Sequence, residues 1–167
     1  MNTTKPRFKI LFLCTGNSAR SILAEFIANK QARHRLDAYS AGAAPKGAPH
    51  PMAIKVLRES FAIDATNARS KSWEEFKDVN FDFVITVCDK AKESCPVWPG
   101  QPVIAHWGSP DPVEFEGSDE ERQRHFWQVA QQIQRRIELF TSLPFESLDK
   151  LRLESATKEI GLKETSI

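Results

Sequence analysis

The sequence lacks long apolar runs and has almost no surplus of charge of either sign. Near the N-terminus the longest apolar run covers residues 10–13, which is too short for a membrane-spanning helix or the core of a signal peptide. The chain contains 23 Lys and Arg against 22 Asp and Glu, a formal net charge of +1. Binding to nucleic acid or to a membrane surface normally needs a broad basic field, so we expect neither as a partner. These absences predict a cytoplasmic protein that holds any anion at a local site.

Cysteine is scarce as well, and this limits what the thiols can do. Three cysteines in a reducing compartment do not form a disulfide framework, and their number is odd. Neither a C-x2-C spacing nor an H-x3–5-H spacing accompanies them, which disfavours a zinc site. We therefore expect no resident metal or cofactor. The cysteines are then either buried packing residues or reactive groups.

The expected fold is a single α/β domain spanning residues 1–167. With 41% hydrophobic and 27% charged residues, and no internal repeat or linker, the chain can form one core. Strand-like segments alternate with segments of helical periodicity, which predicts a mainly parallel sheet with right-handed crossovers. The expected strands are 8–13, 36–40, 81–87 and 103–107, and the expected helices are 22–34, 52–60, 118–140 and 145–160, the last ending at Gly161. Ser118 and Glu121 form an S-x-x-E capping box at the start of the helix 118–140.

Three segments that can carry chemistry follow predicted strands. Cys14 comes directly after the first strand, Cys88 lies at the end of the third, and the tight loop 108–112 follows the fourth. Binding sites in open parallel sheets form beyond the carboxyl ends of the strands. We therefore expect these three segments to meet at one edge of the sheet.

The strongest signal is the C-x5-R spacing of Cys14 and Arg20 between a strand and a helix. Backbone N–H groups of this loop can turn inward beside the positive end of the helix and form a nest for a tetrahedral anion. The Arg20 guanidinium can donate a bidentate pair of hydrogen bonds to that anion, and Gly16 lets the loop turn tightly. The same positive field lowers the pKa of Cys14, which predicts a nucleophilic thiolate aimed at the anion. The predicted anion-binding residues are Thr15, Gly16, Asn17, Ser18, Ala19, Arg20 and Ser21.

Cys88 and Cys95 form a second signal, because they are seven residues apart in a charged and polar segment. On a helix with a rise of about 1.5 Å per residue they lie about 10.5 Å apart on one face, whereas a disulfide needs Cα atoms within about 7 Å. The pair can form a disulfide only if the helix unwinds, and unwinding the polar segment 89–94 exposes little core. Lys90 and Lys92 favour a thiolate nearby. The alternatives are that the cysteines are unrelated packing residues or that this pair holds zinc.

Residues 14–21, Cys-Thr-Gly-Asn-Ser-Ala-Arg-Ser, followed by Ile-Leu-Ala-Glu, resemble the phosphate loop of the low-molecular-weight protein tyrosine phosphatase superfamily. The resemblance covers about residues 8–141. It implies a three-layer sandwich around a central, mainly parallel four-stranded sheet, with residues 145–161 as a C-terminal helical extension. The superfamily has two main activities, phosphatase and arsenate reductase, which the loop alone separates poorly.

The cysteine pair and the segment 105–112 (AHWGSPDP) resemble the thioredoxin-coupled arsenate reductases of this superfamily. The phosphatases carry tyrosines after the Asp-Pro, where this chain has Val113 and Glu114, and Tyr39 is its single tyrosine. The resemblance therefore implies an enzyme that reduces arsenate to arsenite. One alternative is a phosphatase acting on phosphotyrosine or small phosphoesters. Another is a non-catalytic oxyanion-binding module.

For an arsenate reductase the resemblance implies a relay of three cysteines. Cys14 attacks arsenic(V) while Asp111 protonates the departing oxygen, and Cys88 then attacks the Cys14 sulfur so that arsenite leaves. Cys95 attacks Cys88 in turn, and thioredoxin or another dithiol donor reduces the disulfide that results. Asp111 also has a purely structural interpretation, because Ser-Pro-Asp-Pro forms a good turn in any protein.

Some relatives bind a potassium ion behind the loop, and Asn17, Glu25 and Ser40 match part of that site. Where those relatives supply Thr and Asp, this chain has Arg69 and Lys71. The Lys71 ammonium can take the place of the ion. We therefore expect an activity that does not depend on potassium.

Overall fold

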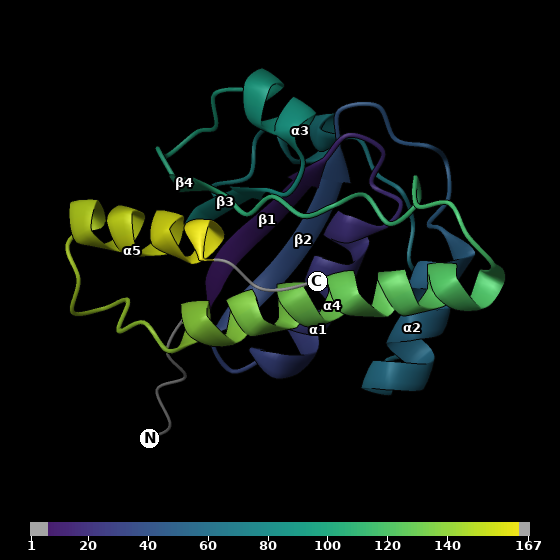
Figure 1. Ribbon diagram of the computed structural model, residues 1–167. Helices are drawn as coiled ribbons and strands as arrows, with labels where there is room; N and C mark the ends of the chain where they lie inside the picture. The colour runs from purple at the N-terminus through teal and green to yellow at the C-terminus, as the bar shows by residue number, and fades with distance from the viewer. Residues whose placement is uncertain (1–6, 164–167) are drawn as a thin grey trace.

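The computed structural model describes residues 7–163 and contains one four-stranded sheet flanked by helices (Figure 1). The strands are β1 (Phe8–Cys14), β2 (Leu36–Gly42), β3 (Phe83–Thr86) and β4 (Val103–His106). The helices are α1 (Arg20–Gln31), α2 (Pro51–Phe61), α3 (Asp89–Ser94), α4 (Asp119–Thr141) and α5 (Lys150–Leu162), with a 3-10 helix, η1 (Trp73–Phe76). The predicted strands and helices are all present, and η1 is an element that the sequence pattern did not indicate.

The strand order is β2-β1-β3-β4, and all three pairings are parallel. Cys14 pairs with Gly42, Leu13 with Thr86, and Thr86 with His106, so the four strands end near the same edge. This confirms the predicted parallel sheet. It also places the loops that follow the strands on one side of the molecule.

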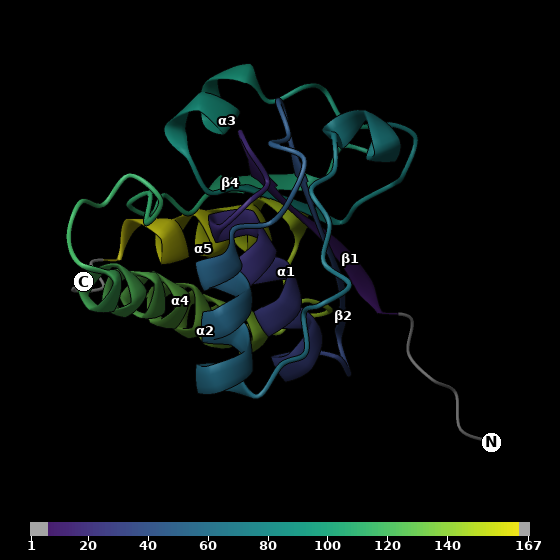
Figure 2. The ribbon, with the colours of Figure 1, turned by 90° about the vertical axis from the view of Figure 1, so that its right-hand side faces the viewer.

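Helices cover both faces of the sheet (Figure 2). Helices α1, α2, α4 and α5 lie on one face, while α3 and η1 lie on the other. This is the three-layer α/β sandwich that we expected. No helix among residues 7–163 combines the length and the apolar composition that a membrane crossing requires.

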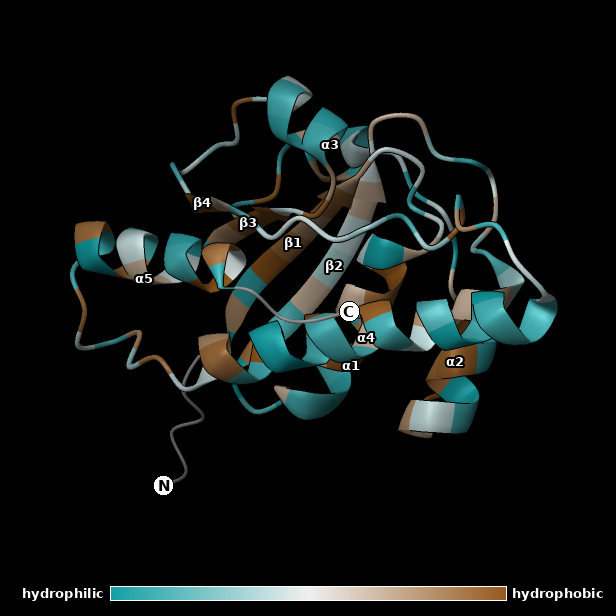
Figure 3. Cartoon of the chain, viewed as in Figure 1, coloured by the Kyte–Doolittle hydropathy of each residue, from teal (hydrophilic) through white to brown (hydrophobic). Residues whose placement is uncertain are grey.

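β1 is the centre of the core. Residues 10–13 are fully buried, because β1 has a strand on each side and helices or loops on each face. In Figure 3 β1 and β3 are mostly hydrophobic and β2 is paler, whereas α3 and much of α4 are hydrophilic. The apolar run that was too short for a membrane is therefore the central strand of the domain.

α4 begins at the predicted capping pair. Ser118 Oγ accepts a hydrogen bond from the Glu121 backbone N–H at 3.2 Å and donates one to the Glu121 carboxylate at 3.0 Å. The helix ends at Thr141, before Pro144, which cannot continue it.

α5 begins later than the predicted range of 145–160. Phe145 is buried, and its ring packs against the rings of Phe8 and Phe140 instead of entering a helix. Asp149 then caps the helix by accepting a hydrogen bond from the Arg152 N–H at 2.9 Å.

Gly161 lies inside α5, so the prediction that it ends the helix is wrong. A Cβ atom on Gly161 would collide with the carbonyl oxygen of His106 at the end of β4. The glycine therefore permits close packing of α5 against β4, and helix termination is not its role.

Candidate active site

The loop between β1 and α1 has the form that the C-x5-R spacing predicted. Cys14 is the last residue of β1 and Arg20 is the first residue of α1. The left-handed turn lies at Asn17, with a φ of 46°, so the assignment of the turn to Gly16 is wrong. Gly16 instead leaves room for Lys46, whose side chain would lie 3.1 Å from a Cβ atom at this position.

Asn17 holds the loop from behind. Its Nδ2 donates hydrogen bonds to Ser21 Oγ at 2.8 Å and Ser40 Oγ at 3.0 Å, and its Oδ1 accepts one from the Lys71 N–H at 2.8 Å. Ser70 Oγ also donates to the Asn17 carbonyl oxygen at 2.7 Å. Because the side chains of Asn17 and Ser21 are fully buried on this side, neither residue lines the cavity in front of the loop, and we assign them a supporting role.

A cavity of about 440 Å³ opens in front of the loop. Its walls include eight of the residues expected at the site, namely Cys14, Thr15, Gly16, Ser18, Ala19, Arg20, Cys88 and Asp111. The remaining walls are Ala44, Lys46, Asp89, Lys90 and Glu114, and none of the lining residues is aromatic. Within residues 7–163, the backbone N–H groups of 17–19 have no protein acceptor. The loop and the three cationic residues that line the cavity, Arg20, Lys46 and Lys90, therefore suit a small oxyanion.

The segment that follows β4 orients the Arg20 side chain through Ser109 and Asp111. Arg20 Nη1 donates to the Ser109 carbonyl oxygen at 2.9 Å, and its Nη2 lies 3.5 Å from the Asp111 carboxylate. The other carboxylate oxygen of Asp111 accepts a hydrogen bond from the Val113 N–H at 3.0 Å. Arg20 and Asp111 are thus held side by side in the cavity wall. The sequence analysis did not identify Ser109, because its contact with Arg20 is made by a backbone carbonyl oxygen, which every residue has.

Cys14 ends β1, Cys88 follows β3 on the neighbouring strand, and both side chains line the cavity, where each thiol shifts the pKa of the other. The pKa of Cys88 is lowered to about 5, chiefly because the Cys14 thiol donates to it and also because the Thr15 hydroxyl lies 3.3 Å away. The same hydrogen bond, together with burial, raises the pKa of Cys14. This direction is opposite to the lowered Cys14 pKa that the C-x5-R loop predicted.

This coupling predicts a titration that can be measured. As the pH rises, one thiolate per molecule should form with a midpoint near pH 5, which the ultraviolet absorbance of thiolates reports. Cys14→Ala should move the midpoint toward the ordinary value of 9.0, because the main hydrogen-bond donor to Cys88 is removed. A midpoint unchanged by Cys14→Ala would contradict this origin, and Cys88→Ala is the control that removes the Cys88 thiol, so that any remaining thiolate belongs to Cys14 or Cys95.

Cys95 lies apart from the other two cysteines. Cys88 and Cys95 flank α3 as its N-cap and C-cap residues. Cys95 lines a second cavity of about 510 Å³, walled partly by β4 and α5. Burial raises the pKa of Cys95, so the thiolate-promoting effect expected from Lys90 and Lys92 does not prevail there.

α3 has the polar character that its sequence suggested. Ala91 is its single buried residue, and Figure 3 shows the helix as hydrophilic. Unwinding α3 would therefore expose little apolar surface. All three cysteines are free thiols, which makes this the reduced form.

Lys71 fills the position behind the loop where the resemblance implied a cation. Its buried Nζ donates to the Arg69 carbonyl oxygen at 2.9 Å and lies 3.3 Å from the Glu25 carboxylate. It also lies 3.4 Å from Ser40 Oγ, which itself donates to Glu25 at 2.7 Å. The ammonium group thus has the oxygen neighbours that a bound cation would have. Among residues 7–163 no group of three or more His, Cys, Asp or Glu side chains could hold a metal ion.

Lys46 is a cavity residue that the sequence analysis missed. The loop after β2 runs beside the Cys14 loop, with the Ala44 N–H donating to the Thr15 carbonyl at 2.9 Å and the Lys46 N–H donating to the Gly16 carbonyl at 3.0 Å. Burial and nearby cations, Lys46 among them, lower the pKa of His50. The position of this loop after a parallel strand was the signal that could have revealed it.

Comparison with known proteins places the chain among related sequences. A family model described as low molecular weight phosphotyrosine protein phosphatase matches residues 9–152. An arsenate reductase of Oceanobacillus iheyensis is 43% identical over 133 residues, covering 78% of this chain and 93% of the relative. An arsenate reductase of Bacillus subtilis is 37% identical over 131 residues, with the same shares covered.

Solved structures similar to this one come from the same two kinds of protein, arsenate reductases and low molecular weight phosphatases. A structure described as an arsenate reductase in the phosphate binding state is 28% identical, with a TM-score of 0.64, covering 78% of this chain and 94% of that one. A low molecular weight protein tyrosine phosphatase from T. tengcongensis shares the fold at 24% identity, with a TM-score of 0.69 over 81% of this chain and 99% of that one.

Proposed function

The chain belongs to the low-molecular-weight phosphotyrosine protein phosphatase family, and we propose that within this family it acts as an arsenate reductase. The observation that carries the proposal is that two thiols, Cys14 and Cys88, stand in the wall of one oxyanion-sized cavity. A phosphatase needs one nucleophile, whereas reduction of arsenic(V) needs two electrons, which two thiols supply when they form a disulfide. Among residues 7–163 no aromatic side chain lines the cavity, whereas a phosphotyrosine ring would need aromatic walls to grip it.

In the first step, the loop N–H groups and Arg20 hold arsenate in front of Cys14. The Cys14 sulfur attacks arsenic, and its proton passes to the Cys88 thiolate along the hydrogen bond between the two sulfurs. Asp111 protonates the departing oxygen, which leaves as water. Arsenic(V) is then bonded to the Cys14 sulfur.

In the second step, Cys88 passes its proton to Asp111, which is now a carboxylate in the same cavity wall. The Cys88 sulfur attacks the Cys14 sulfur, so that a disulfide bond forms as the sulfur–arsenic bond breaks. The bonding electron pair stays on arsenic, which leaves as arsenite. Two thiols have been oxidised and arsenic has been reduced by two electrons.

In the third step, α3 unwinds and the Cys95 thiolate attacks the Cys88 sulfur, which releases the Cys14 thiolate. Unwinding also removes Cys95 from the burial that raises its pKa. A protein dithiol, for which we propose thioredoxin, reduces the final disulfide. The cycle needs free thiols and no resident cofactor, so we propose a reducing compartment such as the cytoplasm.

The proposed function is tested by NADPH oxidation in the presence of thioredoxin and thioredoxin reductase, with and without arsenate. We expect arsenate-dependent oxidation, measured beside hydrolysis of p-nitrophenyl phosphate. Exchange of thioredoxin for glutaredoxin with glutathione identifies the donor. Hydrolysis without any arsenate-dependent oxidation would favour the phosphatase alternative and reject the reductase.

We propose that Lys71 replaces a potassium ion, so turnover should be the same in potassium and sodium salts of equal ionic strength. Lys71→Ala should destabilise the chain by about 3 kcal/mol in urea unfolding, because Glu25 loses its buried partner. Any activity that Lys71→Ala loses should return when potassium is added. Strong activation of the unsubstituted protein by potassium would contradict the proposal.

A further inference from the structure

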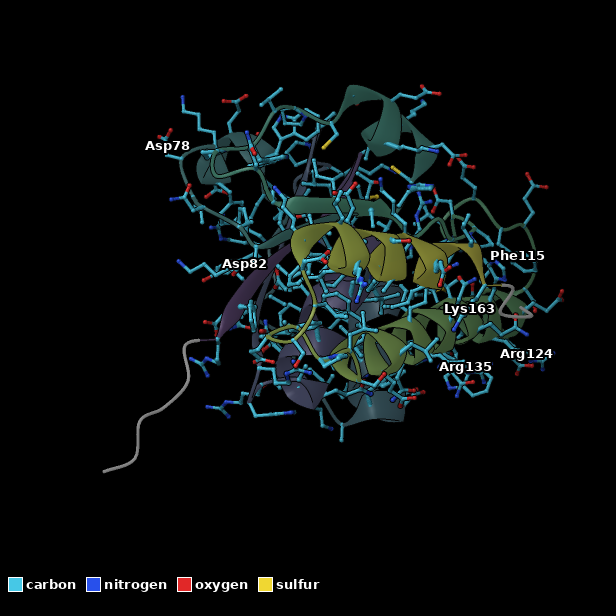
Figure 4. The ribbon with its side chains drawn as sticks, turned by 90° about the vertical axis from the view of Figure 1, so that its left-hand side faces the viewer. Asp78, Asp82, Phe115, Arg124, Arg135 and Lys163 are labelled. Carbon is cyan, nitrogen blue, oxygen red and sulfur yellow. The ribbon has the colours of Figure 1, made fainter. Side chains whose placement is uncertain are left out.

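The C-terminal extension lies against the segment that carries Asp111. α5 packs between β4 and α4, as Figure 4 shows. The buried Trp107 indole N–H donates to the Thr157 carbonyl oxygen in α5 at 3.0 Å. Gly161 brings the last turn of α5 directly against the backbone of His106. The end of α5 therefore packs directly against His106 and Trp107, just before the 108–112 loop.

Arg136 reaches the same segment from α4, and its environment is unusual for a cation. The side chain is 4% exposed, and it contacts no carboxylate among residues 7–163. Its Nη1 donates to the Gly108 carbonyl at 2.8 Å, and its Nη2 donates to the Gly161 carbonyl in α5 at 3.4 Å. Its Nε has no hydrogen-bond partner in the described part of the chain, residues 7–163. A buried charge without a counter-ion destabilises a fold, so stability alone does not explain an arginine here.

Ser109 connects this buried arginine to the active site. Its hydroxyl donates to Gln132 Oε1 at 2.8 Å and lies 3.5 Å from Arg136 Nη1. Gln132 and Arg136 lie one helical turn apart on the buried face of α4. The carbonyl oxygen of Ser109, on its other side, accepts the 2.9 Å hydrogen bond from Arg20. The position of Ser109 thus determines the direction of the Arg20 guanidinium.

We propose that Arg136 and α5 brace the segment 107–109 and so hold Arg20 in the orientation that grips the oxyanion. Arg136 is a positioning residue, since it acts through Ser109 and touches neither substrate nor cysteine. The inference rests on the proposed function, because it concerns the same oxyanion site. It also assigns a role to α5, most of which lies beyond residue 152, where the family match ends.

The brace is tested by binding of inorganic phosphate to the reduced full-length chain, measured by calorimetry well below the unfolding temperature. Arg136→Met should raise the phosphate Kd about tenfold, because the hydrogen bond that orients Arg20 is no longer held in place. Arg135→Met is the matched control: its side chain is exposed on the same helix (Figure 4), and the Kd should change by less than about twofold. Arg136→Lys should restore part of the affinity, since it keeps a charge that reaches one carbonyl.

A second pair of variants tests the role of α5. It also tests the proposed brace if Arg136→Met does not fold. Gly161→Ala should push the last turn of α5 away from His106 and weaken phosphate binding several-fold, whereas Ser155→Ala on the exposed face should not. A purely stabilising role would lower the Tm of these variants and leave the phosphate Kd of the folded protein unchanged. That result, in folded Arg136→Met or in Gly161→Ala, would overturn the brace and leave the reductase proposal intact. Absence of phosphate binding by the unsubstituted chain would overturn both.

Discussion

Replacing Cys88 with serine is expected to lower thioredoxin-dependent arsenate turnover by on the order of 10³-fold or more. A serine hydroxyl cannot form the disulfide that gives arsenic its two electrons, so the cycle stops at the arsenic adduct of Cys14. Hydrolysis of p-nitrophenyl phosphate should persist, because it needs Cys14, Arg20 and Asp111 alone. The substitution should also favour this hydrolysis, because the neighbouring Cys88 thiol is the largest cause that raises the pKa of the Cys14 nucleophile. Both assays are run on one preparation, so that the loss of arsenate turnover can be compared directly with the retained hydrolysis.

Two further variants locate the stage at which the relay stops. Cys95→Ser should release about one arsenite per protein molecule and then halt with Cys14 and Cys88 disulfide-bonded, which mass spectrometry of alkylated peptides detects. Cys14→Ser should abolish both activities, since the nucleophile of each is lost. Normal multiple turnover by Cys95→Ser with thioredoxin would show that the third cysteine is not part of the relay.

Asp111→Asn is expected to lower kcat for arsenate and for p-nitrophenyl phosphate by about 10²-fold, which is a typical contribution of a general acid. Asparagine keeps the size of the side chain and the acceptor oxygen for the Val113 N–H, but it cannot supply the proton. Phosphate affinity should change little, because Arg20 keeps its hydrogen bond to the Ser109 carbonyl. Steady-state kinetics beside phosphate calorimetry separate the two quantities.

Glu116→Gln is the control for Asp111→Asn, because it removes an exposed carboxylate from the same loop without reaching the cavity. Its kcat should equal that of the unsubstituted chain. An unaltered kcat in Asp111→Asn would assign Asp111 to the turn that Ser-Pro-Asp-Pro forms. Another proton donor to the leaving oxygen would then be needed.

The local architecture of this protein could be predicted from the order of its residues. Apolar runs bounded by turn residues located the strands, helical periodicity with caps such as Ser118 located the helices, and their alternation predicted the parallel sheet. Because parallel strands end at one edge, the sequence also predicted that Cys14, Cys88 and the 108–112 loop come together. Each of these inferences depends on neighbouring residues or on a general topological rule.

The tertiary structure alone decided which groups touch and what charge each of them carries. The proximity of the two thiols raises the pKa of Cys14 and lowers that of Cys88, against the expectation from the C-x5-R loop. Gly161 was interpreted as a helix end, although it is a point of close packing against β4. pKa values and packing contacts depend on distances of a few ångströms between residues far apart in the chain. Those distances exist only once the strands have paired and the helices have packed on them.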